Sequence, residues 1–583
     1  MSRSSGGRRR LGVAGILLAA VLVLALALRL KGIAYGLPYS FVNSDETIVV
    51  PKAFHVAQGH LNPQFFFYPS LYFYLTGALY LLAAPVWWLA GHGNFLSQTS
   101  FVVHQGPYFL LGRLLSVTMG TASVYLVFRL GRDAFGRPAG LIAALLLAVA
   151  PLAVAYSHMA VTDMTAVAFS LLALVLLLRA ARPADAAGPA APLADGATGA
   201  GGPAVGDVRA AGAPPAARPH AARWLVAGAV AAGLATSTKY NLGVLVLPAT
   251  VAAVFACRPR AAARVAAGGR TVLVWLRLLV VRLYLPMAAA FVLASPFVVL
   301  DAHHFLHDFR RQSRIMERGW LGFEHTGNGF WFNVTPNLTG AIGVVLVVLG
   351  VAGIGWALWR RTRFDLIVAP YVIVYFVYIS TWKELADRYL LPIVPLLLLL
   401  AARLCVEAVV LVGPRVRRVA IPVVAVVLAV AFILPLSASI AFVGDLSGTD
   451  TREVAREWIQ QHVPAGSLIA LENYSPPLVQ ENALGHYRAA GLDPVAYRVV
   501  RLTLPAPGTP DRSRDLTRLR RQGVQYVVVS SRVDDRVLAA PEVYPTAVAF
   551  YEQLAAEAQL VKEFRPGPGE RGPVLKLYRL TGS

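Results

Sequence analysis

The chain has 583 residues, of which 57% are hydrophobic and only 14% are charged, and its mean hydropathy is +0.58. This composition excludes an ordinary soluble enzyme and predicts a polytopic α-helical membrane protein. The formal net charge is +22, most of it before Ser447, where arginines between apolar runs orient spans and contact anionic lipid. Nucleic-acid binding is disfavoured, because the polar part has no basic face with interleaved aromatic residues.

The first apolar run, residues 11–28, carries no charge and is long enough to cross a bilayer. It predicts an uncleaved first span, because no small-residue cleavage site follows it cleanly. Later runs predict about eleven spans in all, with the aromatic-rich residues 71–90 forming a re-entrant or interface-lying helix that does not cross. The Arg-rich connectors then all lie in the cytoplasm, so that in a cytoplasmic membrane the N-terminus is inside and the C-terminus outside.

This orientation places the polar segments that contain the candidate site residues on the same outer face of the membrane. They are residues 31–106, 157–163, 239–241, 301–337 and 382–388. If residues 71–90 crossed the membrane, Asp45 and Asp163 would face opposite compartments. The predicted orientation therefore brings these two carboxylates to one side.

The rest of the chain divides by composition. Residues 1–446 are predicted to form the transmembrane domain, in which the Ala/Gly/Pro-rich segment 183–222 is predicted to be a disordered cytoplasmic linker. Residues 447–583 are predicted to form a small extracytoplasmic α/β domain. Its predicted helices are 451–463, 515–523 and 547–560, and its predicted strands are 467–471, 524–531 and 574–580. The only cysteines, Cys257 and Cys405, imply no disulfide framework.

Asp45 and Glu46 are adjacent carboxylates in a polar stretch just beyond the first span. At the boundary between membrane and water, such a pair can accept a proton or steer an acceptor while a lipid-borne substrate arrives from the bilayer. A plain solvated loop, or a cap for the following helix, is the alternative interpretation.

Asp163 lies at the head of an apolar span, shortly after His158. Ionisable groups at the lip of a span are costly and tend to face a cavity, although an Asp near a helix N-terminus is also favoured by the helix dipole. His158 alone has a structural interpretation as well. His158, Asp163 and Asp45 could form a metal site, but no ligand-spacing motif supports one, so no cofactor is predicted and a divalent metal is left open.

Two further groups supply cations at the outer edges of spans. Lys239, followed by Tyr240, lies between two spans with almost no loop and could either hold a phosphate or extend to the membrane surface. Lys383, Arg388 and Tyr389 belong to the densest charged cluster, which is either an interfacial belt or a phosphate clamp.

The outer loop 301–337 contains His303, His304 and His307, a spacing that could bind a metal. A wet amphipathic helix on the membrane surface, lining an acceptor groove, is the favoured interpretation of this segment.

Six segments in order resemble the GT-C fold of polyprenyl- or dolichyl-phosphate-sugar-dependent membrane glycosyltransferases. The closest likeness is to protein O-mannosyltransferases and aminoarabinose-lipid-A transferases, including bacterial family 39-like proteins. The segments are SDE (44–46), YPSLYFYL (68–75), GRLLSVTMGTASVYLVFRLGRDAFG (112–136), APLAVAYSHMAVTDMTAVAF (150–169), GLATSTKYNLGVLVLP (233–248) and DRYLLPIVPLLLLLAA (387–402). The similarity covers most of residues 10–440, and each motif is weak alone.

The resemblance implies that Asp45 is the first-loop acidic residue needed for catalysis and that Asp163 is the second acidic position. It implies that Lys239, Arg388 and Tyr389 lie near the phosphate of the lipid donor. Tyr68-Pro69-Ser70 departs from the family's His-Pro-Pro-Leu element. This departure argues against the family's usual way of holding donor phosphate and against an assignment to protein mannosylation.

These residues together predict an inverting glycosyltransferase on the outer face of the cytoplasmic membrane. Asp45 would be the base, with Glu46 and Asp163 orienting it or the acceptor; Lys239, Lys383, Arg388 and Tyr389 would receive the phosphate, while Tyr68, His158 and Tyr240 would line the substrate. The expected partners are a polyprenyl-phosphate-linked sugar, membrane lipids and an envelope acceptor that is a lipid, glycan or protein. A flippase for a lipid-linked saccharide and a non-catalytic envelope assembly protein are the alternatives.

Overall fold

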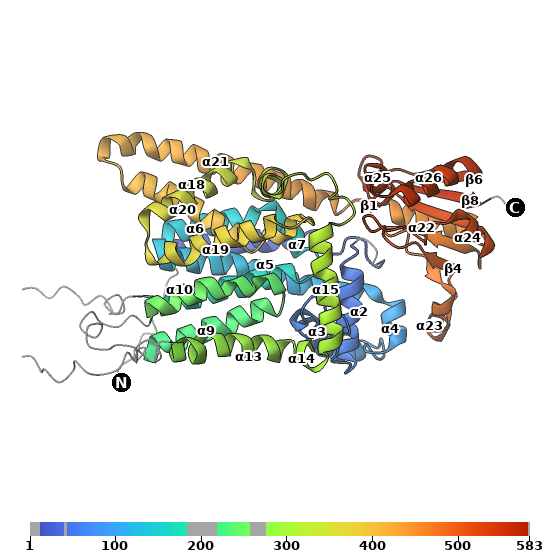
Figure 1. The fold of residues 1–583 in the computed structure, drawn as a ribbon, viewed down its shortest axis with the longest axis horizontal. Coiled ribbons are helices and arrows are strands. Elements are labelled where there is room, and N and C mark those ends of the chain that lie inside the picture. The colour runs from blue at the N-terminus through green and yellow to red at the C-terminus, as the bar shows by residue number, and fades with distance from the viewer. Residues whose placement is uncertain (1–11, 40–42, 183–218, 257–275, 581–583) are drawn as a thin grey trace, which may run out of the picture.

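The computed structural model describes residues 12–39, 43–182, 219–256 and 276–580. Helices occupy the chain as far as Asp445, and an α/β region follows from Thr449. Figure 1 shows the helical bundle at one end of the long axis and this C-terminal region at the other. Most of the linker predicted over 183–222 lies outside the described residues, as does Cys257. The prediction is wrong for its last four residues, because α9 begins at Pro219.

Apolar helices of spanning length make up most of the bundle. In the described ranges, seven are long and apolar enough to cross a membrane, or up to nine if each bent pair counts as one span. The protein is therefore a multi-pass membrane protein, as predicted, whereas the expected number of about eleven spans stays a prediction. The seven are α1 (Val13–Leu30), α3 (Leu71–Leu89), α5 (Gln105–Phe135), α8 (Asp163–Ala180), the run Leu276–Ala294, α19 (Arg363–Ser380) and α21 (Pro414–Asp445).

The bent pairs place breaks inside two further spans. The helices α6 (Arg137–Val149) and α7 (Pro151–Ser157) meet at 60°, and the segment Gly329–Ile342 meets α18 (Val344–Arg360) at 115°. Pro151 explains the first break, since proline lacks the N–H that would continue the helical ladder. The other bundle elements are α9 (Pro219–Thr236), η3 (Tyr240–Leu245), α10 (Val246–Ala256), η4 (Val280–Tyr284), α13 (Leu285–Ala294), α14 (Phe297–Leu300), α16 (Gly329–Phe332), η5 (Asn333–Leu338), α17 (Thr339–Ile342), η6 (Asp387–Leu390) and α20 (Val394–Val410).

Burial separates central helices from peripheral ones. Within its most apolar stretch α8 is 78% buried, whereas the run Leu276–Ala294 is 6% buried and α21 is 11% buried. Most exposed residues of the last two are apolar, apart from charged residues near the helix ends, as expected of helices that face lipid. Small residues allow the inner helices to approach closely: a Cβ added at Gly140 would lie 2.7 Å from the Phe128 carbonyl oxygen of α5.

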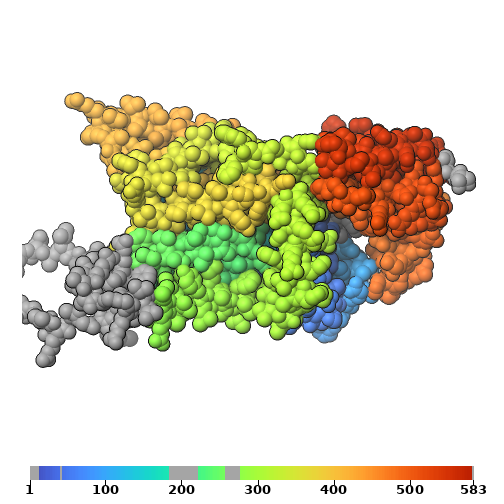
Figure 2. Space-filling view, in the orientation of Figure 1, coloured from blue at the N-terminus to red at the C-terminus, as the bar shows by residue number. Residues whose placement is uncertain are grey.

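Four helices gather at the end of the bundle nearest the C-terminal region. They are α2 (Glu46–Ala57), α3, α4 (Gln98–Val103) and α15 (Ala302–Arg318). Figure 1 shows α15 running across the bundle helices instead of along them, and Figure 2 shows it as a yellow-green ridge beside the C-terminal region. Helix α3 lies with α2 at this end, but it is also long and apolar enough to cross a membrane, so the prediction that residues 71–90 do not cross stays a prediction. The sidedness of the chain itself stays a prediction.

The C-terminal region is built on a six-stranded mixed sheet in the order β3-β4-β2-β5-β8-β6. Strands β3, β4, β2 and β5 are parallel, and β8 pairs antiparallel with both β5 and β6. The strands are β2 (Leu468–Leu471), β3 (Val479–Gln480), β4 (Ala496–Arg501), β5 (Tyr526–Ser530), β6 (Ala558–Phe564) and β8 (Leu575–Leu580), and a separate pair joins β1 (Thr449–Asp450) to β7 (Glu570–Arg571).

The strands predicted at 467–471, 524–531 and 574–580 correspond to β2, β5 and β8. The helix predicted over 547–560 is too long at its C-terminal end, because α26 ends at Glu557 and the chain enters β6 at Ala558. Pairing with β8 decides this boundary, and the sequence pattern does not reveal it. The remaining helices are α22 (Thr451–His462), η7 (Glu481–Ala483), α23 (Leu484–Ala489), α24 (Leu516–Arg521), α25 (Asp534–Leu538) and α26 (Pro545–Glu557).

A bundle loop enters the core of the C-terminal region. Leu321, which lies between α15 and α16, is fully buried in the same apolar cluster as Val527 and Phe550. The Tyr544 hydroxyl donates a hydrogen bond to Glu324 of the same loop. The loop that follows α15 is thereby fixed to the C-terminal region.

Candidate functional site

Asp45 occupies the position just before α2. Its backbone carbonyl accepts the first helical hydrogen bonds, from the N–H groups of Ile48 and Val49 at 3.1 and 3.0 Å. Its side chain makes no capping hydrogen bond. The carboxylate instead accepts a hydrogen bond from Nη1 of Arg388. The capping interpretation therefore does not account for this carboxylate.

Arg388 comes from η6, in the short connection between α19 and α20. Besides Asp45, it faces Glu384, whose Oε1 lies 3.5 Å from Nη2 and 3.2 Å from the Tyr389 hydroxyl. Burial alone lowers the pKa of Arg388, but the Asp45 carboxylate outweighs it and the pKa is raised well above its ordinary value. Arg388 is therefore a permanent cation beside a carboxylate.

Asp163 and Lys239 form a second ion pair, between the first turn of α8 and the turn that follows α9. Both side chains are more than nine-tenths buried, and the Lys239 ammonium lies 4.9 Å from the centre of the Tyr389 ring. Burial lowers the pKa of Lys239, Asp163 opposes this shift, and Arg388 adds to it. The two ion pairs thus interact electrostatically, as the predicted convergence requires.

A cavity of about 110 Å³ is lined by Lys239 of the second pair and by Tyr389, the neighbour of Arg388 in the chain. Asp45, Asp163 and Arg388 are not among its lining residues. Four of the residues predicted for the site line it: Tyr68, Lys239, Tyr240 and Tyr389. Helix α15 supplies one wall, as the expected amphipathic helix. The full lining is Phe67, Tyr68, Pro69, Lys239, Tyr240, Asn241, Phe309, Gln312, Ser313, Met316, Tyr378, Trp382 and Tyr389.

Glu46 points away from Asp45 into the protein. Its carboxylate receives two hydrogen bonds of 2.8 Å from Arg113, both side chains being fully buried, and a third of 2.7 Å from the Ala160 N–H. Arg113 also donates to the Ile33 and Tyr35 carbonyl oxygens. These contacts join the segment after α1 to the turn before α8. They are the contacts of a positioning residue, and a catalytic role for Glu46 stays a prediction.

His158 and Lys383 lie outside the cavity. The buried His158 ring has Nδ1 2.9 Å from the Val154 carbonyl oxygen and Nε2 3.0 Å from that of Lys31, so it ties α7 to the end of α1. Lys383 is exposed, and its backbone N–H donates to the Met316 carbonyl oxygen. The structure therefore does not bring either side chain to the cavity that Tyr68, Lys239, Tyr240 and Tyr389 share.

Sequence reasoning did not assign roles to two residues near the ion pairs. Glu384 shares Oε1 between Arg388 and Tyr389, and Asp387 accepts a 2.9 Å hydrogen bond from the Tyr156 hydroxyl. Both acids belong to the densely charged segment that contains Lys383 and Arg388. That density of charge was the sequence feature from which a role for the two acids could have been inferred. Burial raises the pKa of Glu384, while Arg388 opposes the shift.

No cluster of three or more His, Cys, Asp or Glu side chains that could hold a metal ion occurs among the residues the structure describes. His303, His304 and His307 are exposed on α15, where His304 and His307 contact Asp301 and Asp308.

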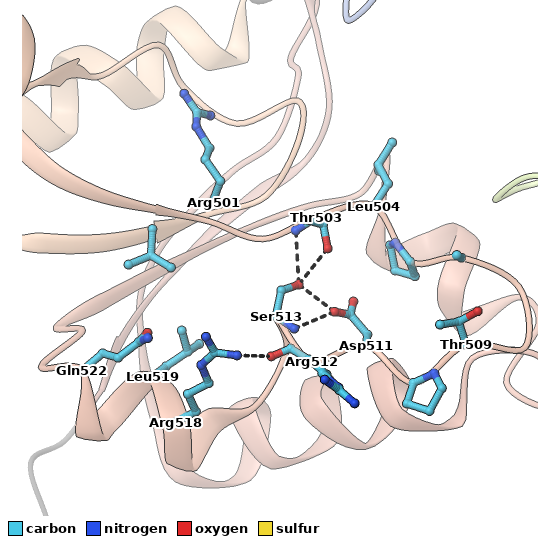
Figure 3. A pocket seen from close by; sticks show the side chains of 14 residues that line it. Arg501, Thr503, Leu504, Thr509, Asp511, Arg512, Ser513, Arg518, Leu519 and Gln522 are labelled. Atoms are coloured by element: carbon cyan, nitrogen blue, oxygen red, sulfur yellow. Dashed lines mark hydrogen bonds between the residues drawn. The ribbon is translucent and has the colours of Figure 1, made fainter. Parts of the chain in front are cut away.

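A larger cavity, of about 590 Å³, lies within the C-terminal region between β4 and α24. Figure 3 shows Thr503, Asp511 and Ser513 joined by hydrogen bonds in its lining, with Arg501 directed away from them. It contains none of the residues predicted for the site.

Comparisons with known proteins agree with this architecture. Residues 94–188 match the family model described as dolichyl-phosphate-mannose-protein mannosyltransferase, and no curated protein matches the chain. The oligosaccharyltransferase of Archaeoglobus fulgidus tethered to an acceptor peptide is 14% identical, with a TM-score of 0.51 over 98% of this chain and 74% of that one.

The same archaeal enzyme, AglB, in complex with an inhibitory peptide and a dolichol-phosphate is 13% identical, with a TM-score of 0.50 over 93% of this chain and 72% of that one. ArnT from Cupriavidus metallidurans bound to undecaprenyl phosphate is 16% identical, with a TM-score of 0.49 over 96% and 97% of the two chains. The expected GT-C fold is confirmed.

Proposed function

From the premise that this chain has the GT-C glycosyltransferase fold, we propose that it transfers a sugar from a polyprenyl-phosphate-linked donor to an envelope acceptor. One observation carries the proposal: the ion pairs Asp45–Arg388 and Asp163–Lys239 both place their cations against the Tyr389 ring, and Tyr389 and Lys239 line an aromatic cavity. The reaction takes place on the outer face of the cytoplasmic membrane, with the C-terminal region on the same side. The match to a mannosyltransferase family model and the complex of AglB with dolichol-phosphate support a lipid-phosphate donor.

Arg388 and Lys239 bind the donor phosphate. Arg388 presents a planar set of N–H donors that suits phosphate oxygens, and Lys239 adds a compact charge held in place by Asp163. The aromatic lining, including Tyr68, Tyr240 and Tyr389, accommodates the sugar and the first part of the lipid chain. As the phosphate leaves, it gains negative charge, which these cations stabilise.

Asp45 is the general base. The acceptor hydroxyl oxygen attacks the anomeric carbon, its proton passes to Asp45, and the bond from that carbon to the phosphate oxygen breaks. The electron pair of the broken bond stays on the phosphate. One displacement inverts the anomeric centre, and a positioned base contributes about 10²–10⁴-fold to such a step.

The described pairing gives the reaction an order. Arg388 holds Asp45, so a donor phosphate that takes over the guanidinium also frees the carboxylate to accept a proton. The donor therefore binds before the acceptor hydroxyl is activated. Glu46 contributes by fixing the loop that carries Asp45, through Arg113 and the Ala160 N–H.

A flippase is the alternative. The charged groups of the site are held in two ion pairs, Asp45 with Arg388 and Asp163 with Lys239, which favours transfer over transport.

The test uses the full chain in lipid nanodiscs with a polyprenyl-phosphate sugar and envelope extract from a deletion strain. Mass spectrometry is expected to find a new glycoside with wild type and none with Asp45→Asn. Full transfer by Asp45→Asn, or a change of donor sidedness in vesicles without a new bond, contradicts the proposal.

A further inference from the structure

A cleft of about 360 Å³ separates the C-terminal region from the first outer loop. Pro38, Tyr39 and Val102 line one wall, and Arg456, Pro477 and Tyr487 line the other. Its volume is within the range of binding sites for small ligands. The cleft is distinct from the cavity beside Lys239, with which it shares no lining residue.

Contacts on two sides hold the cleft open at a fixed width. On one side, Arg456 of α22 stacks 4.2 Å from the centre of the Tyr39 ring and donates a 2.7 Å hydrogen bond to its hydroxyl. On another, α23 packs against α4, as Figure 1 shows, with the His486 ring 3.1 Å from the Thr99 hydroxyl. The site is therefore built before any ligand arrives.

Arg456 carries the only charge among the described residues that line the cleft. Its Nε is buried and has no hydrogen-bond partner in the described part of the chain. An unpaired buried donor costs free energy, about 1–3 kcal/mol and more for a charged group. A ligand with a negatively charged oxygen in the cleft would neutralise the guanidinium.

The cleft is also connected to the proposed base. The Tyr474 hydroxyl lies 3.4 Å from the Ser44 hydroxyl, and Ser44 directly precedes Asp45. Pro477 follows Tyr474 by three residues, so their Cα atoms are at most about 11 Å apart. Tyr474 has a φ of 63°, a left-handed conformation that is uncommon for tyrosine and often occurs at functional sites.

We infer that this cleft binds the acceptor, and that the acceptor is an acidic saccharide whose carboxylate or phosphate group pairs with Arg456. The inference rests on the proposed function, because it names the substrate class of the same reaction. Tyr39 and Tyr487 offer aromatic faces for sugar rings, and Pro38, Val102 and Pro477 supply apolar contact. A lipid acceptor is disfavoured, because the cleft is lined by Val102 of α4 and Tyr487 of α23, and Figure 1 shows both helices beyond the end of the bundle helices.

Binding is measured without donor, so that the result does not depend on transfer. Saturation-transfer NMR on the full chain in nanodiscs compares methyl glucuronide with methyl glucoside as probes. The glucuronide is expected to bind and the glucoside to bind about 10-fold or more weakly, since a hydrogen bond to a charged group is worth that much. Equal binding of the two probes overturns the inference.

Three variants locate the contact. Arg456→Gln is expected to weaken glucuronide binding about 10- to 100-fold, whereas Arg498→Gln, an exposed arginine of β4 outside the cleft, is expected to leave it unchanged. Tyr39→Phe removes the hydrogen bond to Arg456 but keeps the cation, so it is expected to retain binding and controls for loss of cleft structure. If Arg456→Gln binds glucuronide like wild type, the inference is wrong.

Three further outcomes complete the test. In turnover, Arg456→Gln is expected to raise the KM for acceptor while leaving polyprenyl-phosphate binding unchanged. Competition by phosphatidylglycerol but not phosphatidylcholine in the nanodisc would assign the cleft to a lipid phosphate and overturn the saccharide assignment. Failure of transfer with intact glucuronide binding contradicts the proposed function only.

Discussion

Asp45 and Arg388 are 343 positions apart in the chain, yet they form an ion pair beside the cavity that Tyr389 and Lys239 line. The carboxylate proposed as base and the guanidinium proposed for the donor phosphate thus neutralise each other in the described state. Two consequences can be measured separately, because one concerns proton transfer and the other concerns phosphate binding.

Asp45→Asn is expected to reduce transfer by about 10²–10⁴-fold, since the base is lost. The same change is expected to increase the affinity for polyprenyl phosphate, because Arg388 no longer has to leave a charged partner. Initial rates and equilibrium binding check the two effects in one preparation. Glu317→Gln, which alters an exposed carboxylate of α15, is the control and should change neither. Unchanged rates with weaker donor binding would contradict the assignment.

Arg388→Gln is expected to weaken polyprenyl-phosphate binding by about 10- to 100-fold, because hydrogen bonds to a charged group are lost. Lys383→Gln is the matched comparison, since Lys383 belongs to the same charged cluster but is exposed outside the cavity. The affinity of Lys383→Gln for polyprenyl phosphate is expected to stay within about twofold of the wild-type affinity. Equal losses in the two variants would show that the cluster attracts the donor only through its overall charge.

Donor binding is expected to depend on pH through Lys239, whose pKa burial lowers. The ammonium is fully charged below its pKa and loses its proton as the pH rises through it. An ordinary lysine has a pKa of about 10.4. The affinity for phosphate should therefore begin to fall at a pH below that value. Lys239→Arg should shift that fall upward, because arginine stays protonated. Titration of polyprenyl-phosphate binding between pH 7 and 10 tests this, and identical profiles would remove Lys239 from the phosphate site.

Glu46→Gln is expected to lower stability, because it leaves Arg113 charged and incompletely paired in a fully buried position. Loss of one partner from a buried ion pair costs about 3–5 kcal/mol. Thermal unfolding in detergent measures the effect, and Glu46→Gln combined with Arg113→Met should recover part of it. A variant that keeps wild-type stability but loses transfer would instead make Glu46 a catalytic residue.

Much of this organisation could be predicted from the sequence. Apolar runs predicted the bundle, and polar positions at the ends of spans singled out Asp45, Asp163, Lys239 and Arg388, which the structure joins in two ion pairs. Their pairing could not be predicted, because no local pattern tells which carboxylate meets which cation across hundreds of residues. Glu46 shows the same limit: adjacency to Asp45 suggested a shared role, but the first turn of α2 directs the two side chains to different partners.

For His158, a structural role was the favoured interpretation of the residue taken alone, and a place in the substrate site stays a prediction. The residue belongs to a segment that resembles family motifs, yet its two ring nitrogens face the carbonyl oxygens of Val154 and Lys31. The structure therefore gives it a structural environment. Lys383 was chosen for its charge, and exposure of its side chain could not be inferred from the surrounding residues.

Leu321 has a practical consequence for anyone who shortens this chain. A version that stops at residue 446 would present that leucine to water and detach the far end of α15, which forms a wall beside Lys239. Loss of activity in such a truncated protein could therefore result from distortion of the cavity beside Lys239 as well as from loss of the cleft that Arg456 lines. Point substitutions in the full-length chain are the better way to separate the role of the helical bundle from that of the C-terminal region.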